Sequence, residues 1–124
     1  MKRRIDLTNI DLDEVATEID IRRGSWTERG LDVRPFTWTE NDEKWPTPLL
    51  ADRSEVRRPR SLGVRVLLAE QAAVELVVYA GGWADLTLIP PGGTEPEFSY
   101  IEVVEAADVT GRLDEAILRI SAAL

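Results

Sequence analysis

The sequence predicts a single α+β domain over residues 1–124: an antiparallel β-meander of about four to five strands with an N-terminal and a C-terminal helix. Two stretches with helical spacing, 9–24 and 108–124, enclose short β-rich runs separated by glycine pairs. Strands grouped between two helices are typical of a two-layer α+β architecture. The 124 residues suffice to bury one hydrophobic core.

The N-terminal helix is predicted from residues 9–24, where apolar residues recur with a helical period. Asn9 or Asp11 can cap its first turn, and Gly24 suits its end. Its apolar stripe contains Leu12, Val15, Ala16 and Ile19.

Residues 31–39, LDVRPFTWT, favour a strand. Pro35 restricts that strand to an edge or a bulge, because proline donates no ladder hydrogen bond. No periodicity holds from Glu40 to Ser61. A connection this long is either functional or partly disordered, so it is the first place to expect a binding surface.

The pair Gly81-Gly82 between two alternating runs indicates a two-residue type I′ hairpin, in which Ala80 pairs with Trp83. In that register one face carries Val77, Tyr79, Ala84, Leu86 and Leu88, and the other carries Val74, Leu76, Val78, Trp83, Asp85 and Thr87. A shift of one residue would exchange the two sets.

Residues 95–106 continue the meander as a further strand, and helical spacing returns over 108–124. Asp108 or Thr110 is the expected cap of this closing helix. Its apolar stripe contains Val109, Leu113, Ala116, Ile117 and Ile120.

The chain contains no cysteine and no histidine. The commonest general base, the thiolate zinc sites and the usual activators of a nucleophilic serine are therefore missing. Carboxylate pairs such as Glu95 and Glu97 would need desolvation to do acid–base chemistry, and nothing in their spacing requires it. We expect no enzyme, no cofactor and no metal site.

The formal net charge is -8, and residues 62–124 alone carry -7 of it. Such a field repels nucleic acid and anionic membranes and attracts basic partners. No stretch approaches the roughly 20 apolar residues of a membrane span. We expect a cytoplasmic protein with neither a nucleic-acid nor a membrane partner, and the sequence does not fix its oligomeric state.

An arginine-rich segment, residues 53–60, interrupts this acidity with Arg53, Arg57, Arg58 and Arg60. It can be interpreted as an arm that contacts phosphates. Pairing of these arginines with the acids at 40–43 is at least as good an interpretation.

Four tryptophans are many for a chain with two tyrosines and two phenylalanines. For Trp38 and Trp83 we favour packing that covers the second face of the sheet, across Leu76 and Val78. Trp45 stands between acids and prolines, far from any periodic neighbour. Both a core position and an interface anchor remain open for Trp45.

The acidic, cysteine-free single domain, with its meander AVELVVYAGGWADLTLI, its strand EFSYIEVVEA and a closing amphipathic helix, resembles the immunity proteins of bacterial polymorphic-toxin and contact-dependent inhibition systems. The resemblance covers most of the chain in general style. It implies a cytoplasmic protein that binds a cognate toxin domain, often a basic nuclease, and blocks its active site.

The leading hypothesis is therefore an acidic binding surface made by residues 40–45 and the second face of the sheet. The alternative is a small accessory or ligand-binding domain whose half-apolar sheet face is either a ligand pocket or a surface for self-association. In the first case the anchors are Trp45 and Trp83, and the charge partners are Glu40, Asp42, Glu43 and Asp85.

Overall fold

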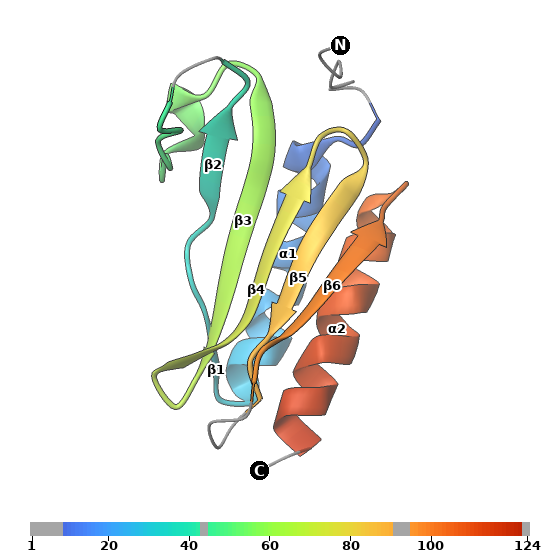
Figure 1. The fold of residues 1–124 in the computed structure, drawn as a ribbon. Coiled ribbons are helices and arrows are strands. Elements are labelled where there is room, and N and C mark those ends of the chain that lie inside the picture. Colours follow the sequence, from blue (N-terminus) through green and yellow to red (C-terminus); the bar gives the residue numbers. More distant parts are fainter. Residues whose placement is uncertain (1–8, 43–44, 91–94, 123–124) are drawn as a thin grey trace.

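The computed structural model describes residues 9–42, 45–90 and 95–122, and in it the chain forms an antiparallel sheet covered by two helices (Figure 1). The predicted α+β fold is confirmed, with six strands in place of four to five. The elements are α1 (Leu12–Glu28), β1 (Leu31–Val33), β2 (Thr37–Glu40), η1 (Arg53–Glu55), β3 (Pro59–Leu68), β4 (Gln71–Tyr79), β5 (Trp83–Leu88), β6 (Glu97–Glu102) and α2 (Ala106–Ala122).

The strands β3 to β6 form the predicted meander, in the order β3-β4-β5-β6. Both β1 and β2 pair with the other side of β3, so they act as one edge strand interrupted at Pro35. The expectation that proline would confine this strand to an edge is confirmed.

The helix α1 begins as predicted, because the Asp11 side chain accepts hydrogen bonds from the backbone N–H groups of Asp13 and Glu14. The predicted stop at Gly24 is wrong, since α1 continues to Glu28. Burial of Trp26 one half-turn later outweighs the cost of about 1 kcal/mol for an interior glycine. The apolar residues Leu12, Val15, Ala16 and Ile19 are buried as expected.

The closing helix α2 buries its predicted stripe of Val109, Leu113, Ala116, Ile117 and Ile120. Neither expected cap is correct. The Asp108 carboxylate reaches back to the N–H groups of Val104 and Glu105, at 2.9 and 3.0 Å, which is the second half of a capping box. The Thr110 side chain is buried and its hydroxyl donates to the Ala107 carbonyl at 3.3 Å.

The predicted register of the β4–β5 hairpin is wrong by one residue. Tyr79 pairs with Trp83, so the loop has three residues, and only Gly82 among them has a positive φ, +101°. Gly81 is required for space, because a Cβ there would lie 2.0 Å from the Trp83 ring. As a result, the β5 residues lie on the opposite faces from those predicted. The buried face carries Val74, Leu76, Val78, Ala84, Leu86 and Leu88.

Candidate functional site

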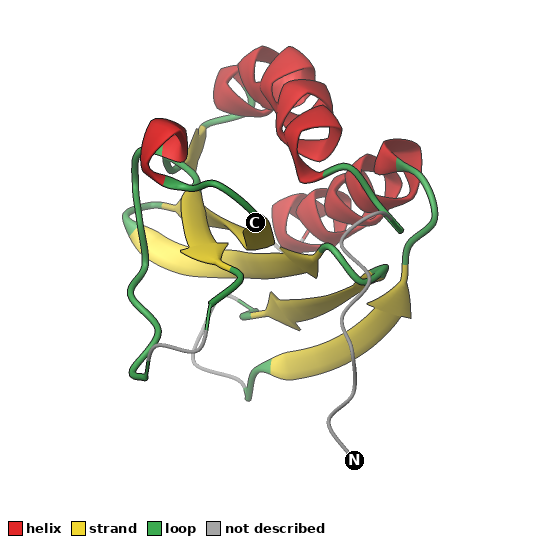
Figure 2. Cartoon of the chain, turned by 90° about the horizontal axis from the view of Figure 1, so that it is seen from above, coloured by secondary structure: helices red, strands yellow, loops and turns green. Residues whose placement is uncertain are grey.

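One face of the sheet is covered by both helices, and the opposite face has no helix in the described part of the chain (Figure 2). The strand registers place three rows of side chains across the central part of this open face. They are Thr37, Gly63, Val77, Asp85 and Tyr100; Thr39, Ser61, Tyr79, Trp83 and Glu102; and Arg65, Glu75, Thr87 and Phe98.

Aromatic side chains dominate the β4–β6 half of this open face. The rings of Tyr79 and Trp83 stack, with centroids 5.2 Å apart and planes inclined by 16°. Phe98 and Tyr100 project from β6 and are 78% and 63% exposed. Sequence reasoning named Trp83 and missed the other three. The alternation of EFSYIE was the available signal, but it needed the correct register to identify a face.

The acids of the open face are only partly neutralised. Arg65 forms an ion pair with Glu75, at 3.2 Å between Nε and Oε1. Within the described residues, the side chains of Asp85 and Glu102 have no ion pair or hydrogen bond. Burial raises the pKa of the Tyr79 hydroxyl, and the negative charge of Asp85 raises it further. The face is therefore aromatic with excess negative charge.

A second exposed region lies in the connection between β2 and β3. Trp45 is 90% exposed and Leu49 is 71% exposed. The chain is nevertheless held in place, because Leu50 and Trp38 exchange two backbone hydrogen bonds of 2.8 Å along the β2 edge. Because its side chain is 90% exposed, Trp45 does not belong to the core, which was one of the two positions left open for it.

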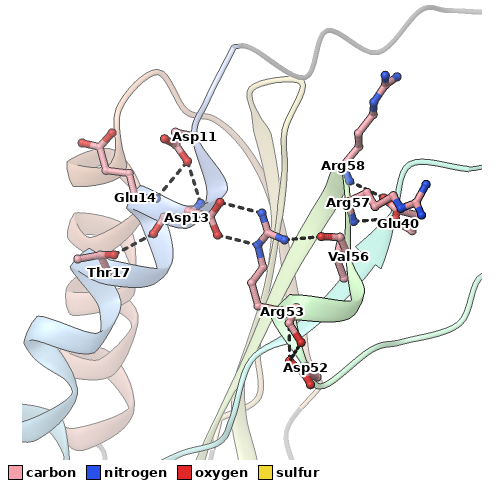
Figure 3. A network of polar contacts seen from close by, with 11 residues as sticks. Asp11, Asp13, Glu14, Thr17, Glu40, Asp52, Arg53, Val56, Arg57 and Arg58 are labelled. Atoms are coloured by element: carbon pink, nitrogen blue, oxygen red, sulfur yellow. Dashed lines mark hydrogen bonds and ion pairs between the residues drawn. The ribbon is translucent and has the colours of Figure 1, made fainter.

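Glu40 has a structural role that the sequence did not indicate. Its carboxylate oxygens accept the backbone N–H groups of Arg57 and Arg58, at 2.8 and 2.7 Å (Figure 3). These two hydrogen bonds hold the pKa of Glu40 below its ordinary value, and the bond from Arg57 contributes most. Asp42 lies beside Glu40, and its carbonyl accepts from Arg60 Nη2 at 2.8 Å. The remaining predicted charge partner, Glu43, lies outside the described residues.

Arg53 joins this connection to α1 and to the core. Its guanidinium binds the Asp13 carboxylate through two contacts, 2.7 and 2.9 Å (Figure 3). It also lies over the Trp38 ring, 5.2 Å from the centroid. The Arg53 hydrogen bond lowers the pKa of Asp13. Glu40 and Asp42 therefore contact this segment through backbone groups, which is not the ion pairing expected for them. The ion pair of Arg53 is made with Asp13 instead.

Two of the four tryptophans belong to the core. Trp26 is 1% exposed, and its indole N–H donates to Asp114 on α2 at 2.8 Å. Trp38 is also buried, facing the helices beside Leu62. The expected packing of Trp38 on the sheet face that carries Leu76 and Val78 is confirmed. The same expectation is wrong for Trp83, which lies on the opposite, open face against Tyr79.

The described residues contain no group of three or more His, Cys, Asp or Glu side chains that could hold a metal ion. Across the same ranges, no helix combines the length and apolar character needed to span a bilayer. The predicted site residues that the structure describes fall into two regions, Trp83 with Asp85 on β5, and Glu40, Asp42 and Trp45 at the end of β2 and beyond.

Fold and surface together define an α+β protein with one uncovered, aromatic and acidic sheet face. No protein-family model, curated protein or solved structure matches this chain.

Proposed function

We propose that this chain is a bacterial immunity protein, which acts in the cytoplasm by binding a cognate, basic toxin domain and blocking its active site. The observation that carries the proposal is the sheet face that no described helix covers, on which four aromatic side chains share rows with Asp85 and Glu102, acids without an ion pair among the described residues. Aromatic anchors within a polar rim are typical of protein interfaces, and complementary charge speeds association with a basic partner. This function needs no catalytic residue.

The exposed Trp45 provides a second anchor for the same partner. Leu49, four residues further on, lines a groove together with Thr37 and Val77 of the open face. This groove makes the connection and the sheet continuous as a surface. In the sequence, Asp42 and Glu43 precede Trp45 and add negative charge, while Glu40 holds the connection in shape.

The test is capture of a partner that depends on the open face. The tagged chain is expressed in its native host, and proteins that it retains at low and high salt are identified. Tyr100→Lys places a positive charge on the open face and should weaken retention at least about tenfold, as expected for an interface anchor. Ile21→Lys on α1 is the matched control, because Ile21 is 70% exposed and lies outside the sheet.

The captured protein is then expressed alone and together with this chain. We expect it to arrest growth when alone and to be harmless beside the wild-type chain. Co-expression with the Tyr100→Lys variant should protect poorly. Retention of no protein, or of a protein that does not harm cells, would overturn the proposal. Concentration-dependent self-association that Tyr100→Lys abolishes would instead support the alternative of a self-associating domain.

A further inference from the structure

Asp85 lies at the centre of the aromatic half of the open face. It pairs directly with Tyr100 of the neighbouring strand β6, and on its own strand β5 it is two residues from Trp83. Tyr79 and Phe98 occupy diagonal positions on the two neighbouring strands. Diagonal neighbours in a sheet are about 7–8 Å apart, within reach of aromatic side chains. A single carboxylate therefore has four aromatic residues at the neighbouring positions of this face.

The charge of Asp85 is not used within the described parts of the chain. Its side chain is exposed and makes no ion pair or hydrogen bond there. The arginines near this face have other partners: Arg65 pairs with Glu75 and Arg34 with Asp32. Arg60, whose charge reaches Tyr79, donates to the Asp42 carbonyl. An unpaired carboxylate among aromatic rings attracts a cation twice, by its charge and by the negative faces of the rings.

We propose that this cluster, the Asp85 cage (Asp85, Tyr79, Trp83, Phe98 and Tyr100), binds one arginine side chain of the partner protein. The carboxylate would accept hydrogen bonds from the guanidinium, and the rings would stack on its plane. Arginine suits the cage better than lysine, because its planar group combines two hydrogen bonds with stacking. The inference rests on the proposed function in that it names the group by which a basic partner is recognised.

The cage is tested on the full chain with two capped pentapeptides, Gly-Ser-Arg-Ser-Gly and the same peptide with citrulline, which keeps the shape and loses the charge. Binding is followed by NMR, through the indole N–H of Trp83 and the amide of Asp85. We expect saturable shifts with the arginine peptide and an affinity for the citrulline peptide about fivefold lower, which is about 1 kcal/mol at 25 °C.

Two matched variants locate the effect. Asp85→Asn should weaken binding of the arginine peptide about fivefold, the amount an exposed ion pair contributes. Asp20→Asn makes the same change of charge on α1 and should leave binding unchanged. Tyr100→Leu, which removes a ring from an exposed position, should also weaken the arginine peptide more than the citrulline peptide.

Equal affinities for the two peptides, or equal effects of Asp85→Asn and Asp20→Asn, would overturn the cage, even if a toxic partner is captured through the open face. Selective binding of the arginine peptide supports the cage, and it does so even if no toxic partner is found. The failure of the cage and the failure of the proposed function are thus separate results.

Discussion

Replacement of tryptophans by alanine should separate the exposed anchor from the core. Trp45 is 90% exposed, so Trp45→Ala should change the free energy of unfolding by no more than about 0.5 kcal/mol. Trp26 is 1% exposed and donates a hydrogen bond to Asp114. Trp26→Ala should cost about 3–5 kcal/mol, because it opens a cavity and removes that donor. The contrast is a large fraction of the total stability of about 5–15 kcal/mol expected for a folded domain.

The measurement is urea denaturation followed by circular dichroism, since tryptophan fluorescence is altered by the substitutions themselves. The slope of free energy against urea should stay constant for Trp45→Ala, which indicates that the folded and unfolded states are unchanged. A loss above about 1 kcal/mol for Trp45→Ala, or below that value for Trp26→Ala, would refute the assignment of the two rings. If the assignment holds, any loss of partner binding by Trp45→Ala reports on the interface.

Three further predictions concern the connection and the hairpin. Because Arg53 lowers the pKa of Asp13, their pair stabilises the fold above the unfolded pKa of about 3.9 and is lost as pH falls through the lower folded value. Urea denaturation should therefore separate wild type from Asp13→Asn by up to about 1 kcal/mol at pH 7, and a gap that persists at pH 2 would contradict the pairing. Glu40→Gln should speed hydrogen exchange at the Arg57 amide, because that amide donates to the Glu40 carboxylate. Unchanged exchange would contradict the proposed role of the carboxylate in holding the connection. Gly82→Ala should cost about 1 kcal/mol or more in the same denaturation assay because φ is +101°, and a neutral effect would contradict the three-residue loop.

The helices and the meander could be predicted from the sequence because periodicity reports directly on burial. The stripes of α1 and α2 were identified correctly, since each apolar residue repeats at the helical period. The end of α1 was not predicted correctly, because Gly24 is a good stop signal in isolation and only the tertiary burial of Trp26 overrides it.

The face of the hairpin could not be predicted because glycine has two uses. Gly81 resembles a residue that needs positive φ, whereas in the structure it makes room for the Trp83 ring. This single ambiguity exchanged the two faces of β5 and concealed the aromatic cluster. The roles of Glu40 and Arg53 depend on contacts across 17 and 40 positions of the chain, which no local pattern encodes.

The contacts of Arg53 have a consequence for the way this protein opens. One guanidinium touches Asp13 at the start of α1, the Trp38 ring on β2 and the Val56 carbonyl. Fraying of the first helical turn and detachment of the connection that carries Trp45 therefore break the same side chain's bonds. Amide protection at these two distant places should rise and fall together, as in one cooperative unit of local unfolding.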